Sequence, residues 1–107
     1  MTTQIRVIEP HGIFDGIQAA KFCQEVEQLL GKKVDMVVVD FRNVTLMDSS
    51  GLGALVQVLK MTRQAQVQLI LCSFNEQVQT LFELTGMDRV FEILVGREEL
   101  EYKIYQP

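Results

Sequence analysis

The chain has 107 residues, 48% of them hydrophobic and 22% charged, and its ten Lys and Arg against fourteen Asp and Glu give a formal charge of −4 at pH 7. This length suits one domain and is too short for two, and the hydrophobic content suffices for a core, which excludes an intrinsically disordered chain. The negative charge repels phosphate backbones, so we expect no nucleic-acid partner.

The first half of the chain predicts two short strands, a helix and a core strand. Residues 4–8 and 12–14 are the short strands, and we expect them to pair through the turn between them. Residues 17–30 have their apolar side chains on one helical face, and Gly31 follows as a C-terminal stop. Residues 36–41 form a largely β-branched run, which is typical of a central strand covered on both faces.

Helices and strands alternate in the second half. A helix that begins near Ser50 has apolar residues spaced i, i+3, i+4 and i+7, and residues 68–72 resume the strand pattern. A third helix is expected to end at Gly86. Residues 90–95 are predicted as a last strand and residues 97–105 as a short final helix.

This order of elements predicts the fold class. Strands that alternate with helices imply right-handed βαβ units and a sheet with helices packed over it. We therefore expect an α/β fold, in one domain over residues 1–107, with a mixed, mostly parallel sheet of about four to five strands packed against about three to four helices.

The cysteines and the N-terminal sequence bear on the compartment. Cys23 and Cys72 lie in apolar patterns without a Cys-x-x-Cys motif or a Cys/His cluster, which indicates buried free thiols in a reducing compartment and no metal site. The N-terminus lacks the basic stretch and long apolar run of a signal peptide, and apolar runs such as residues 36–39 are too short to span a membrane. We expect a cytoplasmic protein with no cofactor and no membrane partner.

The connection after the predicted core strand is where we expect function, because functional groups of open α/β sheets lie beyond the carboxyl ends of the strands. Gly51 and Gly53 fall in the first turn of the next helix, where each costs up to about 1 kcal/mol relative to Ala. Leu46 and Met47 lie next to polar residues in an apparent loop, so we expect at least one of them to be exposed to a partner.

Two serines, Ser49 and Ser50, stand at the start of this helix. A serine hydroxyl there can cap an unpaired backbone N–H group, which explains one serine but not two with flanking glycines. The free N–H groups and the positive end of the helix dipole also favour an added phosphate, which would bring about −1.5 to −2 charges to the surface. On physical grounds, a helix cap and a phosphorylation switch are both open.

The ten residues Val-Thr-Leu-Met-Asp-Ser-Ser-Gly-Leu-Gly at positions 44–53 resemble the phosphorylation-site signature of the anti-sigma factor antagonist family, the bacterial members of the STAS domain group. Three other segments are similar to the family. Residues 12–15 resemble its early Gly-x-Leu-Asp turn, residues 37–41 its central strand and residues 82–87 its late helix end.

The resemblance implies a STAS-type fold and a regulatory protein that is not an enzyme. The serine after the aspartate, here Ser49, would accept phosphate from ATP, delivered by a serine protein kinase that is often the anti-sigma factor itself. The unphosphorylated form would bind the anti-sigma factor and so regulate transcription, and a PP2C-type phosphatase would reset the cycle. Ser50 would cap the helix. The partner-binding residues implied are Asp15, Leu46, Met47, Asp48, Ser49, Ser50, Gly51, Leu52 and Gly53.

Other functions were weighed against this switch. An enzyme with Ser49 as nucleophile would need a base, but no Gly-x-Ser-x-Gly elbow is present and His11, the single histidine, has no triad partners. We therefore expect no catalytic residue. A non-switching STAS module in a lipid-transport or stress-signalling complex is the alternative. Asp15 is equally suited to be the N-cap of the first helix.

Overall fold

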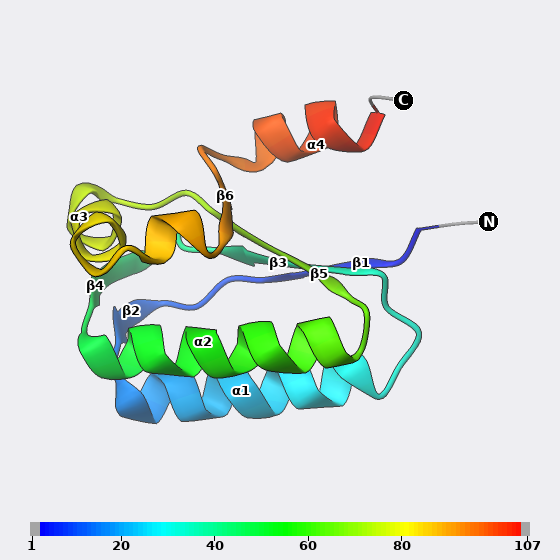
Figure 1. The fold of residues 1–107 in the computed structure, drawn as a ribbon, viewed down its shortest axis with the longest axis horizontal. Helices are drawn as coiled ribbons and strands as arrows, with labels where there is room; N and C mark the ends of the chain where they lie inside the picture. The colour runs from blue at the N-terminus through cyan, green and yellow to red at the C-terminus, as the bar shows by residue number, and fades with distance from the viewer. Residues whose placement is uncertain (1–2, 106–107) are drawn as a thin grey trace.

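The main sheet contains, in spatial order, the strands β1 (Ile5–Ile8), β3 (Met36–Asp40), β5 (Gln68–Cys72) and β6 (Glu92–Leu94), and each pair of neighbours is parallel (Figure 1). The structure, a computed structural model, describes residues 3–105, with the backbone alone for residues 102–105. The predicted core strand is β3, which ends at Asp40. All of its residues are buried, as expected for a β-branched strand between two covered faces.

Two long helices, α1 (Gly16–Leu30) and α2 (Ser49–Gln64), lie side by side against one face of this sheet (Figure 1). Both follow the predicted apolar periodicity. Asp15 is the N-cap of α1, because its carboxylate accepts hydrogen bonds from the N–H groups of Ile17 and Gln18 at 3.1 Å each. The capping role considered for Asp15 is thus confirmed.

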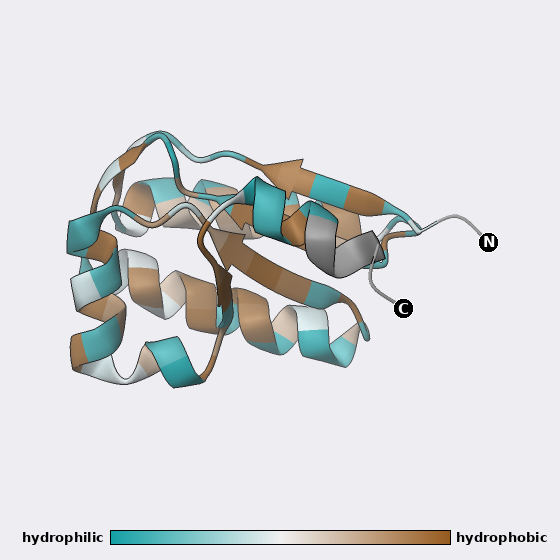
Figure 2. Cartoon of the chain, turned by 90° about the horizontal axis from the view of Figure 1, so that it is seen from above, coloured by the Kyte–Doolittle hydropathy of each residue, from teal (hydrophilic) through white to brown (hydrophobic). Residues whose placement is uncertain are grey.

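Three further helical segments complete the fold: α3 (Glu76–Thr85), the 3₁₀ turn η1 (Met87–Arg89) and α4 (Arg97–Tyr105). α4 lies on the opposite side of the sheet from α1 and α2, so the sheet separates two cores (Figure 1). Successive residues of β3 alternate between them: Val37 and Val39 face the larger core, whereas Met36 and Val38 face the smaller one. Apolar residues accordingly dominate the central strands in the hydropathy view (Figure 2).

The predicted pairing of residues 4–8 with residues 12–14 is wrong. β2 (Gly12–Phe14) instead pairs in parallel with β4 (Val44–Met47) in a separate two-stranded sheet, and β4 is a strand where the sequence indicated only a loop. Gly12 has a φ of +69°, and its N–H donates to the carbonyl of Asn43 at 2.9 Å, so the chain turns away from β1 at this residue.

The last strand is shorter than predicted. Residues 90–95 were expected to be extended, but η1 precedes them and the N–H groups of Val90 and Phe91 still donate to the carbonyl of Met87. β6 therefore begins only at residue 92. α3 stops at Gly86, where φ is +74°, as predicted. The final helix over residues 97–105 also agrees with the prediction. Within residues 3–105, no helix is long and apolar enough to cross a membrane.

Candidate functional site

The first turns of α1 and α2 meet β2 and β4 at one end of the molecule, on the left in Figure 1. A β-carbon placed on Gly16 would lie 3.5 Å from the β-carbon of Ser50, so the two helix starts lie close together. This end therefore brings Asp15 together with the segment that contains both serines, although they are more than thirty residues apart in the sequence.

Asp48, not Ser50, is the N-cap of α2. Its backbone is extended, with φ −105° and ψ 179°, and its carboxylate oxygen Oδ1 accepts a hydrogen bond from the N–H of Gly51 at 3.0 Å. The expectation that Ser50 caps the helix is wrong, because the chain is already helical at Ser49 and Ser50 lies inside the first turn.

The side chains of Ser49 and Ser50 are both exposed. The Ser49 hydroxyl makes no hydrogen bond to the part of the chain that the structure describes, and Asp48 already supplies the cap. Ser50 lies against Gly16 of α1. Ser49 thus presents a hydroxyl with no structural duty at the positive end of a 16-residue helix.

The two glycines of the motif differ in their surroundings. A β-carbon on Gly51 would lie 2.7 Å from ring carbon Cδ2 of Phe14, whereas a β-carbon on Gly53 would meet nothing within 4 Å. Gly51 is buried and allows α2 to approach β2, while Gly53 lies on an open surface. We therefore correct the interpretation of Gly51, which serves packing rather than partner contact.

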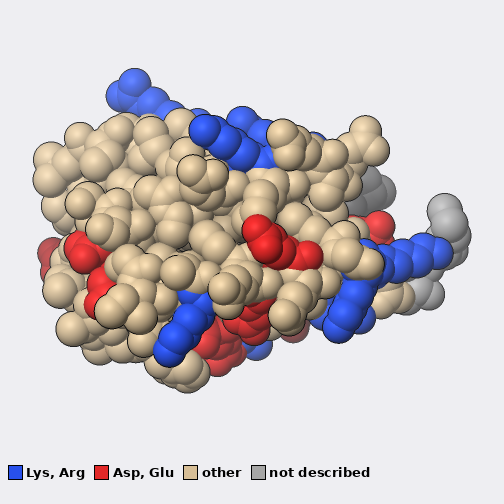
Figure 3. All heavy atoms as spheres, turned by 90° about the horizontal axis from the view of Figure 1, so that it is seen from below, with Lys and Arg blue, Asp and Glu red and all other residues tan. Residues whose placement is uncertain are grey.

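Three apolar side chains on the elements that meet at this end are exposed: Ile13 of β2 (52%), Ile17 of α1 (71%) and Leu46 of β4 (45%). Ile13 and Leu46 are paired residues of β2 and β4. We call Ser49, Gly53 and these three residues the acceptor edge. In the view from below, the surface at this end, on the left in Figure 3, is mostly uncharged, with a few acidic side chains.

Two residues implied as contacts belong to the core instead. Met47 is 2% exposed and Leu52 is also buried. Of the pair Leu46 and Met47, only Leu46 offers its side chain to a partner, because successive residues of a strand point to opposite faces.

No sequence pattern indicated the residues that hold the outer edge of β4. Gln77 of α3 accepts a hydrogen bond from the Met47 N–H at 2.8 Å and donates one to the Met47 carbonyl at 2.9 Å. Asn75, the N-cap of α3, donates to the carbonyls of Val44 and Thr45 at 3.1 and 3.2 Å. Asn75 was recognisable as a helix start, but no local pattern distinguishes Gln77 from Gln79, the other glutamine of this helix.

A family model described as the STAS domain matches residues 1–101 of the chain. An anti-sigma-B factor antagonist from Listeria monocytogenes is 34% identical over 82 residues, which cover 77% of this chain and 72% of the relative. The chain belongs to the STAS domain family of anti-sigma factor antagonists.

Solved structures agree with this family. A candidate anti-sigma factor antagonist from Thermotoga maritima matches this STAS domain with a TM-score of 0.84 at 25% identity, over 94% of this chain and 86% of that one. The anti-sigma factor antagonist SpoIIAA in its unphosphorylated form matches with a TM-score of 0.79 at 18% identity, over 100% and 95% of the two chains. The Bacillus cell fate determinant SpoIIAA in its phosphorylated form gives 0.69 at 18% identity, over 95% and 94%. The predicted STAS-type α/β fold is confirmed.

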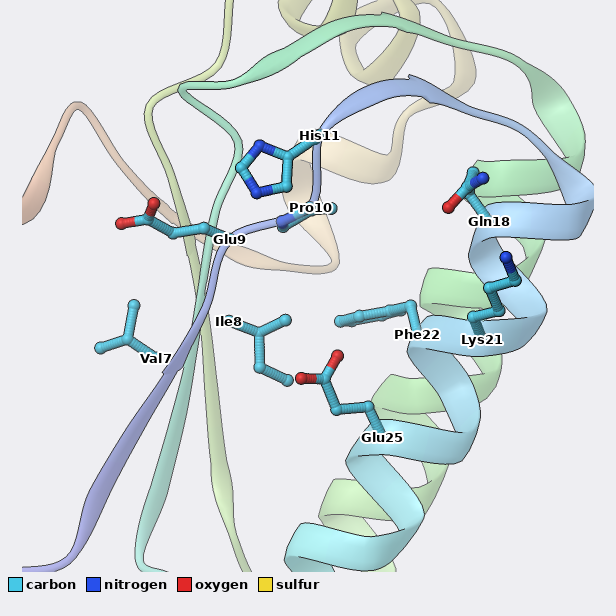
Figure 4. Close-up of a pocket in the computed structure, with 9 residues that line it drawn as sticks. All are labelled: Val7, Ile8, Glu9, Pro10, His11, Gln18, Lys21, Phe22 and Glu25. Atoms are coloured by element: carbon cyan, nitrogen blue, oxygen red, sulfur yellow. The ribbon is translucent and has the colours of Figure 1, made fainter.

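A separate hollow of about 290 Å³ lies between the end of β1 and α1 of the STAS domain (Figure 4). Ile8 and Phe22 form its apolar floor, and Glu9, Lys21 and Glu25 stand among its polar walls. It includes none of the residues predicted for the site. Its mixed charges and apolar floor point to no particular ligand.

A buried carboxylate lies at the end of β3. Asp40 is fully buried, and its Oδ2 accepts hydrogen bonds from the Nε atoms of Arg42 at 2.9 Å and Arg97 at 2.7 Å. Arg97 also pairs with Glu9. These contacts attach the start of α4 to the sheet, so Asp40 has a structural role.

Both cysteines are free thiols, as predicted, but only Cys72 is buried, whereas Cys23 is half-buried. Burial raises the pKa of the Cys72 thiol above its ordinary value of 9.0, and the Asp40 carboxylate adds to this rise. Burial likewise raises the pKa of the Cys23 thiol, with a further contribution from Glu27. Both shifts favour the protonated, unreactive thiol.

Proposed function

We propose that this STAS domain is a phosphorylation-controlled protein-binding switch: in its unphosphorylated form it binds an anti-sigma factor, and phosphate on Ser49 prevents that binding. The observation that carries the proposal is the exposed Ser49 hydroxyl, which has no structural partner and follows directly after the N-cap Asp48. The antagonist named in Listeria supports the binding role, and the phosphorylated SpoIIAA supports modification of a protein with this fold.

The start of α2 suits a phosphate electrostatically. The Gly51 N–H is occupied by the Asp48 carboxylate, which leaves the N–H groups of Ser49 and Ser50 as the unpaired donors of the first turn. These donors and the helix dipole favour a bound or attached dianion. The serine is therefore a chemically suitable acceptor.

The same phosphate would oppose docking at the acceptor edge. Ile13, Ile17 and Leu46 offer an apolar contact surface, and Gly53 lets a partner approach the helix backbone. A phosphoserine would add about −1.5 to −2 charges within this surface, beside the carboxylates of Asp48 and Asp15, so a closely packed partner would lose contact and meet like charge.

The proposed partners follow from the family resemblance. We propose that a serine protein kinase, which is the anti-sigma factor or acts with it, modifies Ser49 and that a PP2C-type phosphatase removes the phosphate. All three would meet in the cytoplasm. A non-switching STAS module would bind its complex without any modification of Ser49.

The experiment is phosphorylation with ATP and the anti-sigma kinase recovered with this protein from its native cells, followed by intact-mass and fragment analysis. Ser50→Ala is the matched control, because it removes the adjacent exposed hydroxyl. We expect one phosphate on the wild type and on Ser50→Ala, and none on Ser49→Ala. Equal phosphorylation of Ser49→Ala would exclude Ser49 as the acceptor.

A further inference from the structure

We propose that Gln77 is a positioning residue for the phosphate acceptor: its side-chain amide holds the backbone of Met47 and thereby sets where α2 begins and how the Ser49 hydroxyl is presented. This inference rests on the proposed function of Ser49. It gives α3 a role in the switch that does not depend on α3 touching the partner.

The geometry imitates a neighbouring strand. The Met47 N–H donates to Gln77 Oε1 at 2.8 Å, and Gln77 Nε2 donates to the Met47 carbonyl at 2.9 Å. An amide side chain offers the same donor and acceptor as a peptide group. Because β2 pairs with the inner edge of β4, Gln77 completes the outer edge at the last residue of the strand.

Asn75 extends the same arrangement, so we refer to Asn75 and Gln77 together as the amide clamp. Asn75 Nδ2 donates to the carbonyls of Val44 and Thr45, while its Oδ1 accepts from the Val78 N–H at 2.9 Å. Val78 and Phe82 anchor α3, since both are fully buried in the main core. The amide clamp therefore holds β4 in a fixed position relative to α3.

Just beyond β4, the backbone is held less firmly on the side that faces β2. Asp48 lies between Met47 and Ser49, and its N–H reaches the Phe14 carbonyl only at 3.5 Å, the limit of a hydrogen bond. The two Gln77 bonds to Met47 are 0.6 Å or more shorter than this contact. Loss of Gln77 should consequently release Met47 and Asp48, and with them the first turn of α2.

The first test needs no kinase. Gln77→Met keeps the length and helix propensity of the side chain but removes both hydrogen bonds. Gln79→Met is the matched control, because the Gln79 amide donates to Glu83 on the same helix. By NMR we expect the Met47 amide proton of Gln77→Met to exchange at least about fivefold faster than in the wild type, with shift changes concentrated in residues 44–51, and no such change in Gln79→Met. Wild-type exchange at Met47 in Gln77→Met would overturn the proposal.

The second test separates positioning from simple support of the fold. With the anti-sigma kinase and ATP, we expect Gln77→Met to lower kcat for Ser49 phosphorylation by about tenfold or more while KM changes little, because the acceptor edge keeps its side chains and only the hydroxyl is misplaced. Faster exchange at Met47 with unchanged kcat would overturn the proposal, because the clamp would then be structural alone.

Two controls keep the outcomes distinct. If Gln77→Met fails to fold, Gln77→Glu takes its place. This substitution retains an acceptor for the Met47 N–H but places a carboxylate oxygen against the Met47 carbonyl. We expect the same changes in exchange and in kcat, and their absence would equally overturn the proposal. Phosphate on Ser49→Ala would refute the proposed acceptor, whereas wild-type behaviour of the Gln77 variants with a phosphate-free Ser49→Ala would refute only the positioning role.

Discussion

Gly51 and Phe14 are in direct backbone contact, and a β-carbon on residue 51 would lie 2.7 Å from ring carbon Cδ2 of Phe14 and closer still to the Phe14 carbonyl oxygen. No ordinary side chain fits into that space. The first turn of α2 therefore lies against β2 only because residue 51 has no side chain, and the position of Ser49 depends on that approach.

Gly51→Ala is expected to destabilise the domain. The added methyl group must displace the Phe14 backbone, and overpacking of this kind costs about 1–3 kcal/mol, more than the gain in helix propensity restores. Gly53→Ala is the matched control, since its β-carbon meets open space and should be neutral or stabilising by up to about 1 kcal/mol. Urea unfolding measures both. Equal effects of the two substitutions would contradict the packing role of Gly51.

Ser49→Glu is expected to weaken binding of the anti-sigma factor by about tenfold or more, because it places a charge inside a closely packed apolar surface. The melting temperature should change little, since the side chain is exposed at a helix N-terminus, where negative charge is tolerated. Gln57→Glu adds the same charge at an exposed position further along α2 and serves as the control. Isothermal titration calorimetry compares them, and unaltered affinity of Ser49→Glu would refute the electrostatic switch.

Arg97→Met is expected to lower the free energy of unfolding by about 1–3 kcal/mol. The substitution removes the 2.7 Å hydrogen bond to the buried Asp40 carboxylate, which then keeps only Arg42 as a charged partner. Chemical denaturation measures the change, with Arg89→Met of the exposed η1 turn as the control. A loss no greater than that of the control would mean that Arg42 alone stabilises the charge of Asp40.

Alkaline pH should destabilise the fold partly through Cys72. Its pKa is higher in the folded protein than its ordinary value of 9.0, so the fold favours the protonated thiol. This contribution to the free energy of unfolding is complete below that value and is lost as the pH rises through the folded pKa. Cys72→Ala should therefore lose less stability than the wild type between neutral pH and pH values above 9.0, on top of a constant loss from the smaller side chain. Identical pH dependence would show that the thiol does not contribute.

The helices and the central strand were predictable from the sequence because their signals are local. The apolar spacing of residues 17–30 and the β-branched run before Asp40 each need only their own neighbours to be interpreted. The pairing of β2 was not predictable, since three residues contain no information about which strand they meet. β4 was missed because its four residues lie among polar ones and the adjacent apolar pair Leu46 and Met47 breaks the alternation expected of a strand.

The sequence was sufficient to predict a serine at the start of α2, but not the residues that hold its segment in place. Asp48, Ser49 and Ser50 are all good N-caps, so the sequence alone does not decide which of them has the extended backbone. The contact of Gly51 with Phe14 and the hydrogen bonds of Gln77 join segments that are distant along the chain. Only the fold shows that one glycine is required for packing and the other is not.

The amide clamp also has a consequence for synthesis on the ribosome. Met47 and Gln77 are 30 residues apart and Ser49 lies two residues nearer to Gln77, so at a translation rate of about 5–20 residues per second the proposed acceptor serine is made roughly 1–6 s before the amide that holds its segment. During that interval the nascent chain contains Ser49 but lacks the Gln77 side chain that positions it. A kinase that recognises the folded segment would consequently ignore unfinished chains and act on completed molecules.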